Sequence, residues 1–180
     1  MNVRIISGKF GGRIIQSPGG NGPTHPMSDR VRGSLFNIIN DKITGADALD
    51  VFAGTGSLGL EALSRGAASA TFVERDRLAS KILFENIATL GVEQQTTSVQ
   101  IGAATWIGKN QDKRYDIIFV DPPYDDMQFS VVKKLVSLVK PGGMMVLSYP
   151  QRTEVPDMEG LIKVDDRNYG GASLGFYRKG

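Results

Sequence analysis

The spacing of the apolar residues changes along this chain, and each change predicts a different element. Near the start, two short β-type runs flank a stretch that contains three glycines. This order predicts a two-stranded hairpin over residues 3–17, because glycine allows the positive φ angles of a tight turn. After a loop rich in glycine and proline, apolar residues recur every three or four positions. They predict a helix from an N-cap at Ser28 to about Asp41.

From Asp47 onward, apolar runs of strand length alternate with helical stretches. The strand-like runs are ALDVF (48–52), ATFVE (70–74), TSVQI (97–101), YDIIFVD (115–121) and MMVLSY (144–149). Strands this apolar, separated by helices, are typical of a mainly parallel sheet covered on both faces. One of the helices is predicted over residues 129–140, ending before Pro141. The final runs, 161–170 and 173–179, have no helix between them, so they predict an antiparallel hairpin at one sheet edge.

Composition restricts the chemistry available to the chain. Its 180 residues, 41% of them hydrophobic, suffice for one globular domain with a continuous core. With no cysteine and His25 as the single histidine, we expect no disulfide, no thiolate nucleophile and no metal site. No apolar run approaches the roughly 20 residues that span a bilayer, so we expect a cytoplasmic protein without a membrane segment.

The charge is uneven although the net charge is only +2. The residues before Asn40 include five basic side chains and one acid, Asp29. The basic charge is therefore concentrated in the predicted hairpin and helix, and the rest of the chain is slightly acidic.

The stretch DVFAGTGSLG, residues 50–59, contains the pattern G-x-G-x-x-G. This pattern suits a dinucleotide or S-adenosylmethionine, since both ligands approach bare backbone at a strand-to-helix turn. Glu74 follows Gly54 by 20 residues and could bind the ribose of either ligand. Asp50, just before the loop, favours a ligand with a cationic amino-acid portion; the alternative is that Asp50 caps the following turn.

The most specific motif is DPPY, residues 121–124, at the end of an apolar strand. An exocyclic amine on a nucleobase is a poor nucleophile because its lone pair is delocalised into the ring. If the Asp121 carboxylate and the Pro122 carbonyl each accept one N–H, the nitrogen can pyramidalise and direct its lone pair at a methyl donor. Tyr124 can stack on the base, a contact worth roughly 1–3 kcal/mol. The motif therefore predicts methylation of a base amine.

Taken in order, these motifs resemble the bacterial 16S ribosomal RNA guanine-N2 methyltransferases of the RsmD type, which are class I S-adenosylmethionine-dependent methyltransferases. The resemblance extends over nearly the whole chain and rests on VRIISGKFGGR, HPMSDRVRGSLFN, LDVFAGTGSLGLEALSRGA, FVERD, DPPY and YGGASLGFYR. It implies an α/β, Rossmann-like fold with a seven-stranded, mainly parallel sheet and an antiparallel C-terminal edge hairpin. It also implies a basic extension over residues 1–42, packed on a methyltransferase domain over residues 43–180.

The resemblance implies a set of site residues and partners. The catalytic residues would be Asp121, Pro122 and Tyr124. S-adenosylmethionine would be bound by Asp50, Phe52, Ala53, Gly54, Gly56, Glu74 and Arg75. The RNA contacts would come from Arg4, Lys9, Arg13, Arg30 and Arg32. The partner would be 16S ribosomal RNA in small-subunit particles, and the protein would be a monomer.

Three positions depart from the family pattern, and two other functions stay open. His25 stands where the family usually has arginine, Gly33 where it has glutamate, and 102–104 where an acid commonly follows the strand. Without that acid, we expect adenine to be recognised by backbone and apolar contacts. The alternatives are an adenine-N6 methyltransferase, because DPPY does not specify the base, and a nucleotide- or RNA-binding module without catalysis.

Overall fold

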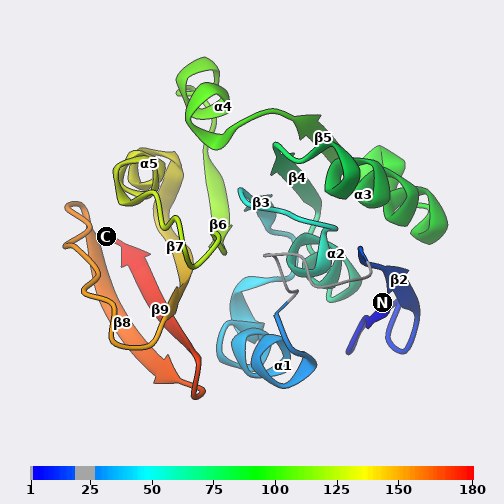
Figure 1. Ribbon diagram of the computed structural model, residues 1–180, viewed down its shortest axis with the longest axis horizontal. Helices are drawn as coiled ribbons and strands as arrows, with labels where there is room; N and C mark the ends of the chain where they lie inside the picture. Colours follow the sequence, from blue (N-terminus) through cyan, green and yellow to red (C-terminus); the bar gives the residue numbers. More distant parts are fainter. Residues whose placement is uncertain (1, 19–26) are drawn as a thin grey trace.

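The computed structural model describes residues 2–18 and 27–180, which form an α/β fold around one seven-stranded sheet (Figure 1). Five strands are parallel to one another: β3 (Asp47–Asp50), β4 (Ser69–Glu74), β5 (Thr96–Gln100), β6 (Tyr115–Val120) and β7 (Val139–Pro150). The last two, β8 (Leu161–Asn168) and β9 (Ala172–Lys179), form an antiparallel hairpin that joins the sheet through β7. The strand order β5-β4-β3-β6-β7-β9-β8 confirms the predicted sheet and its edge hairpin.

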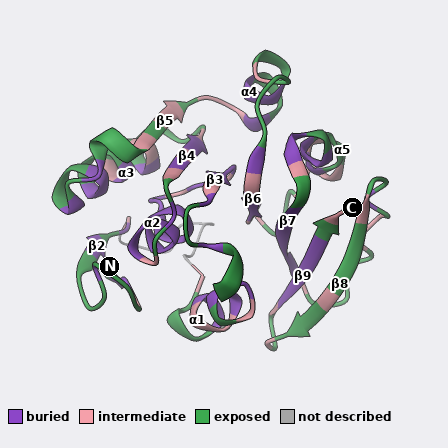
Figure 2. Cartoon of the chain, turned by 180° about the vertical axis from the view of Figure 1, so that it is seen from behind, coloured by how far each residue is buried: buried purple, intermediate pink, exposed green. Residues whose placement is uncertain are grey.

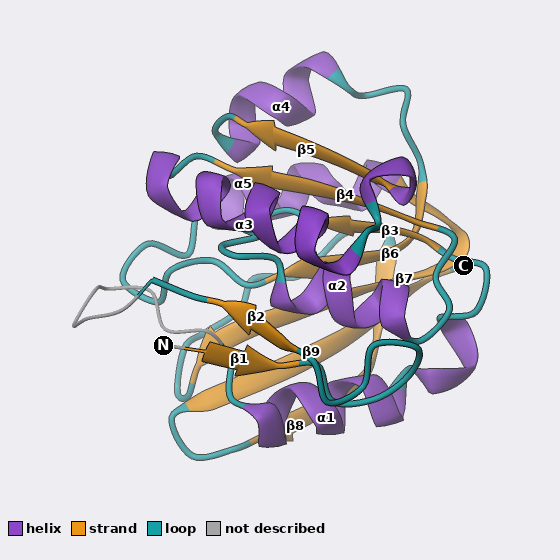
Figure 3. Cartoon of the chain, turned by 90° about the vertical axis from the view of Figure 1, so that its right-hand side faces the viewer, coloured by secondary structure: helices purple, strands orange, loops and turns teal. Residues whose placement is uncertain are grey.

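Helices cover both faces of the sheet (Figure 3). They are α1 (Asp29–Ile38), α2 (Ser57–Ser64), α3 (Arg77–Leu90), α4 (Ala103–Lys109) and α5 (Phe129–Lys134), with 3-10 turns η1 (Asn40–Lys42), η2 (Glu93–Gln95) and η3 (Leu135–Leu138). The first three pack on one face with Phe119 of β6, and α4, α5 and η3 pack on the other with its neighbour Ile118. Because successive strand residues point to opposite faces, a wholly apolar strand contributes to both cores.

Burial follows this layering. Figure 2 shows buried residues along the central strands and a mostly exposed strand β8 at the edge. The chain enters the sheet at β3, runs outward to β5 and returns to β6 on the other side of β3. In open α/β sheets, ligands bind at such a reversal, outside the carboxyl ends of the strands. The fold therefore directs attention to the loops after β3, β4 and β6.

The N-terminal ribbon, residues 2–17, is the predicted hairpin with shorter strands. Its ladder holds only β1 (Asn2–Arg4) and β2 (Ile14–Gln16). The ladder ends early because the ribbon turns toward α2, where the N–H groups of Ile6 and Ser7 donate to the Glu61 carboxylate at 2.9 and 3.1 Å. The turn fits so closely that a Cβ on Gly8, which has φ +88°, would lie 2.0 Å from the Ser64 carbonyl oxygen.

Two other boundaries differ from the sequence-based expectation. The helix predicted over 129–140 gives way at Leu135 to a 3-10 turn, and β7 begins at Val139. Strand β7 therefore includes Pro141, and its pairing with β6 shifts register between Tyr115 and Ile117. This irregular start accommodates a residue that has no N–H to donate. Ser28 does cap α1, accepting from the Val31 N–H at 3.2 Å.

The ribbon and α1 share one hydrophobic core with the sheet and with α2 and α3. Val3, Ile5 and Ile15 of the ribbon are each at most 5% exposed. A two-stranded ribbon is marginal alone, so this packing holds it in place. The division of the chain at residue 42 stays a prediction.

Candidate active site

The glycine loop, residues 51–56, joins β3 to α2 in a backbone shape that glycine makes possible. Gly54 and Gly56 have φ angles of +58° and +93°. A Cβ on Gly56 would also lie 2.4 Å from the Leu83 side chain. Gly59, the third glycine, allows α2 to pack closely on β4. A Cβ at this position would lie 2.3 Å from the Phe72 ring.

Asp50 lies at the end of β3 with its side chain buried. One carboxylate oxygen, Oδ2, accepts from the Gly59 N–H at 3.0 Å, so Asp50 has the capping role that was the alternative to a ligand contact. The other, Oδ1, is buried without a hydrogen-bond partner. Burial raises the pKa of Asp50 to about 7, with the Gly59 bond opposing the rise and the charges of Asp121 and Glu74 adding to it. A buried acceptor with free capacity is suited to a cationic donor from a ligand.

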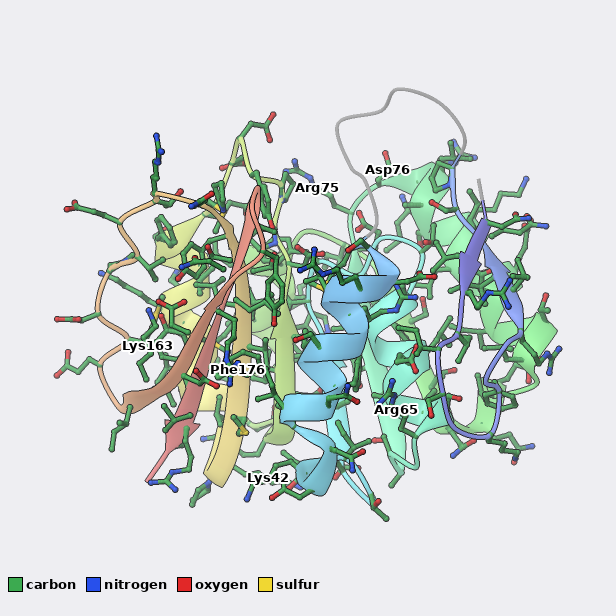
Figure 4. All side chains as sticks on the ribbon, turned by 90° about the horizontal axis from the view of Figure 1, so that it is seen from below. Lys42, Arg65, Arg75, Asp76, Lys163 and Phe176 are labelled. Atoms are coloured by element: carbon green, nitrogen blue, oxygen red, sulfur yellow. The ribbon has the colours of Figure 1, made fainter. Side chains whose placement is uncertain are left out.

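Glu74 ends β4 and lies against the glycine loop. Its Oε1 accepts from the Gly54 N–H at 2.8 Å, and its Oε2 from the Asp76 N–H at 2.7 Å. Each carboxylate oxygen has a second lone pair, so the carboxylate can still accept from ligand hydroxyls. Arg75 is exposed beside Asp76 at the same end of the molecule (Figure 4). Contacts of Arg75, Phe52 and Ala53 with a cofactor stay predictions.

The DPPY loop leaves the sheet at β6, directly beside β3. Asp121 is partly buried, and desolvation raises its pKa to about 6, against the lowering effect of a hydrogen bond from Ser148. Because the charge of Asp121 raises the pKa of Asp50, the two carboxylates are electrostatic neighbours. Pro122 is buried, and Tyr124 is 40% exposed. The structure thus brings the predicted catalytic and cofactor residues to one end of the sheet.

Ser148 is a site residue that sequence reasoning missed. It lies on β7, is 2% exposed, and its hydroxyl is 2.6 Å from the Tyr124 hydroxyl. It therefore connects the aromatic ring of the loop with the Asp121 carboxylate. A narrow crevice beside these groups is lined by Asp121, Ser148 and apolar residues that include Met27 and Leu174. Only the parallel pairing of β6 with β7 reveals this contact, because no motif marks a serine 27 positions after Asp121.

Four of the five predicted RNA-binding residues have exposed side chains. Arg4, Lys9 and Arg13 lie on the N-terminal ribbon, and Arg30 lies in the first turn of α1. Lys9 and Arg13 flank the Phe10 ring at 5.4 and 5.7 Å from its centroid, and Arg13 also donates to the Thr89 carbonyl at 2.9 Å. Their charges are available on the surface, and RNA contact stays a prediction.

Arg32 must be separated from that set. Its side chain is 1% exposed, and its guanidinium donates to the Met27 and Arg4 carbonyls at 2.9 and 2.6 Å. The same group pairs with Asp29 at 2.9 Å and with Glu61 at 3.6 Å. All of this charge is satisfied inside the protein, so in this structure Arg32 holds the ribbon to α1 and α2 and is inaccessible to RNA. A count of basic residues cannot reveal such burial.

His25 and Gly33 are the two single residues that depart from the family pattern. His25 lies outside the described residues. At Gly33 an added Cβ would make only an ordinary contact of 3.6 Å with Ile6, and nothing in the structure explains the glycine. Across the described parts of the chain, no helix is long and apolar enough to cross a membrane, and no cluster of three or more acidic or histidine side chains is arranged to hold a metal.

A family model described as "Conserved hypothetical protein 95" matches residues 3–178. The chain belongs to this family. Ribosomal RNA small subunit methyltransferase D of Escherichia coli K12, a protein of the RsmD type, is 38% identical over 143 residues, which cover 79% of this chain and 69% of that protein. The predicted RsmD resemblance is confirmed.

Two further matches cover nearly the full length of the chain. YlbH of Bacillus subtilis, a candidate rRNA methyltransferase, is 31% identical over 183 residues, covering 98% of this chain and 99% of YlbH. The solved structure of yhhF from Escherichia coli, a candidate methyltransferase, matches with a TM-score of 0.88 at 32% identity, over 99% of this chain and 98% of that one. This RsmD-family chain therefore has a methyltransferase fold.

Proposed function

We propose that this protein transfers a methyl group from S-adenosylmethionine to the exocyclic N2 amine of one guanine in 16S ribosomal RNA, within small-subunit particles. The observation that carries the proposal is the position of the DPPY loop beside the glycine loop, with Asp121 close enough to perturb the pKa of Asp50. An amine-holding loop and a cofactor loop at one reversal of the sheet form a methyltransferase site. The RNA substrate is supported by the names of the relatives and by the exposed basic ribbon.

The residues around the glycine loop fit S-adenosylmethionine. The unpartnered Oδ1 of Asp50 is suited to the ammonium group of its methionine portion, and Glu74 to its ribose hydroxyls. The positive-φ glycines leave bare backbone where the ligand would approach, and a Cβ on Gly54 would meet only open space. When bound, the cofactor supplies a methyl group on an electrophilic sulfonium.

The DPPY loop supplies the groups that act on the amine. The Asp121 carboxylate and the Pro122 carbonyl would each accept one N–H, so that the nitrogen lone pair points away from the ring. The nitrogen loses a proton once it has acquired the methyl group, and Asp121 is the acceptor. Its pKa of about 6 keeps it ionised at neutral pH, yet makes it a stronger base than an ordinary aspartate. Tyr124, held by Ser148, would stack on the base.

The test is mass spectrometry of ribosomal RNA from a strain that lacks this protein, with the strain complemented by the wild-type chain as the control. We expect one N2-methylguanine to disappear from 16S RNA and to return on complementation. Loss of an N6-methyladenine instead would establish the adenine enzyme. An unchanged set of RNA methyl groups would contradict both activities. The DPPY loop can hold either amine, so the structure of the loop does not distinguish the two activities. The experiment does, because it identifies the methylated base.

A further inference from the structure

Asn86 on α3 is a polar side chain buried between two regions that are distant in sequence. It is 2% exposed, and its amide makes three hydrogen bonds. Its Oδ1 accepts from the Gln16 N–H at 2.8 Å, and its Nδ2 donates to the Gln16 carbonyl at 2.9 Å. The second N–H of Nδ2 donates to the Thr55 carbonyl at 3.0 Å. One side chain thus joins the N-terminal ribbon to Thr55 of the glycine loop.

Besides backbone bonds from Val51 and Ala53 to the neighbouring strands, three side chains bind the backbone of the glycine loop and the start of α2, and Asn86 binds between the other two. Glu74 accepts from the Gly54 N–H before it, and Asp50 accepts from the Gly59 N–H after it. Both of these carboxylates are also predicted to face the cofactor. Asn86 differs because its remaining bonds go to β2 of the ribbon, where the amide closes a two-bond ring on the Gln16 backbone as a neighbouring strand would.

The ribbon determines which way the amide faces. An asparagine amide has an acceptor end and a donor end, and a half-turn about its terminal bond exchanges them. The Gln16 N–H requires Oδ1 on its side, which leaves Nδ2 directed at Thr55. In the reversed orientation, Oδ1 would confront the Thr55 carbonyl oxygen. The Gln16 backbone therefore fixes the donor that holds the loop.

We propose that Asn86 is a positioning residue for the cofactor site and that, through it, the N-terminal ribbon is part of the support of the glycine loop. This inference rests on the proposed function in one respect, since it takes the glycine loop to be the cofactor site. It assigns the ribbon a role in cofactor binding that is separate from any contact with RNA. A disturbance of the Gln16 backbone is then expected to weaken cofactor binding, although Gln16 makes no hydrogen bond to the loop.

The test is calorimetry with S-adenosylhomocysteine as the probe, on the full chain without RNA. Asn86→Asp keeps the size of the side chain but replaces Nδ2 by an oxygen that faces two carbonyls. We expect its affinity to fall about tenfold or more, the scale of a lost buried hydrogen bond that leaves acceptors unpaired. Gln16→Pro removes the N–H that orients the amide, and we expect a loss of about threefold to tenfold.

Ser64→Ala is the matched control. It removes two other hydrogen bonds between the ribbon and α2, from the Phe10 N–H at 2.9 Å and to the Ser7 carbonyl at 2.6 Å, and it leaves Asn86 untouched. We expect a lower melting temperature with wild-type affinity for the probe. Near-ultraviolet circular dichroism identifies folded samples, and Asn86→Ala replaces Asn86→Asp if the latter does not fold.

The outcomes are distinct. Wild-type affinity in the folded Asn86 and Gln16 variants would overturn the positioning role. An equal loss in Ser64→Ala would overturn it as well, because any loosening of the ribbon would then be sufficient. If the wild-type protein itself does not bind the probe, the failure belongs to the proposed function.

Discussion

Polar groups are buried in two regions of the molecule: the junction between the N-terminal ribbon and α2, and the active-site end of β3 and β6. The two regions differ in how completely the buried groups are hydrogen-bonded. At the junction, the fully buried Glu61 carboxylate accepts two backbone N–H groups and the Arg65 guanidinium, and it is paired with Arg32. Figure 4 shows Arg65 between α1 and the ribbon. At the active-site end, Asp50 keeps an unpaired oxygen, the single such buried side-chain atom among the described residues. Saturated groups hold the chain together, and groups with spare capacity and raised pKa values remain for a ligand.

The largest expected effect is at Asp121. We expect Asp121→Ala to lower the single-turnover rate by about 10²–10⁴, the scale for a positioned proton acceptor, with cofactor affinity retained. Asp121→Asn is the matched variant because its amide oxygen still accepts a hydrogen bond but takes no proton. We expect it to keep much more activity than the alanine variant. Normal rates in both variants would show that the DPPY loop does not take part in the methyl transfer.

At the junction the expected loss is one of stability. Glu61→Ala removes the acceptor of the Ile6 and Ser7 N–H groups and of the Arg65 guanidinium, together with the negative charge beside the buried Arg32. Breaking a buried ion pair costs about 3–5 kcal/mol. The free energy of unfolding, measured by urea denaturation, should fall by this order. Glu61→Gln keeps one acceptor oxygen and should lose less. A Glu61→Ala variant as stable as wild type would show that the network is not a stabilising one.

Glu74 sharpens the comparison because its carboxylate accepts two backbone hydrogen bonds and is also proposed to bind the cofactor. Glu74→Ala removes the acceptor of the Gly54 and Asp76 N–H groups together with the proposed ribose contact. Calorimetry with S-adenosylhomocysteine should show an affinity about 10-fold to 100-fold weaker, as expected for hydrogen bonds to a charged group. Glu74→Gln should retain part of the affinity. Unchanged affinity in both variants would contradict the proposed ribose contact but not the assignment of the cofactor.

The basic surface of the ribbon should act through phosphate contacts. We expect replacement of Arg4, Lys9 and Arg13 by alanine to weaken binding to small-subunit particles about tenfold and to lower the slope of log affinity against log salt by about 2. The control is the pair Lys163→Ala and Arg167→Ala on β8, because Lys163 lies on the opposite side of the molecule from the ribbon (Figure 4). Equal salt slopes in the wild type, the ribbon variant and the β8 variant would show that the ribbon has a structural role and does not bind RNA phosphates.

The smallest expected effect is at Ser148. Protonation of Asp121 removes its capacity to accept a proton but leaves a carbonyl oxygen as acceptor, so the wild-type rate should fall in part as the pH drops through about 6. Ser148→Ala removes a hydrogen bond that lowers the pKa of Asp121, so the midpoint should move to higher pH. At pH 8 the rate should fall only about twofold to tenfold, the value of one neutral hydrogen bond. The measurement is a pH–rate profile. An unchanged midpoint would show that Ser148 does not influence the pKa of Asp121.

Much of this arrangement could be predicted from local pattern. The alternation of strands and helices determines the sheet, and the glycines, Glu74 and DPPY each follow a strand, so their common location follows from parallel topology. What the sequence could not provide was tertiary pairing. Ser148 reaches Asp121 through the β6–β7 ladder, and Arg32 carries the same formal charge whether it faces RNA or Glu61. Neither relation leaves a signal in residue spacing.

The two edges of the sheet have consequences for handling the protein in concentrated solution. Strand β8 presents the charged residues Lys163, Asp165, Asp166 and Arg167, which discourage a second chain from extending the sheet there. Strand β5, at the other edge, has the uncharged sequence TTSVQ and no proline. The outward-facing backbone groups of β5 are therefore less protected against pairing with a strand of a second molecule. Precipitation at high concentration is expected to start at β5, and a lysine introduced on that strand is the place to begin in preparing a more soluble protein.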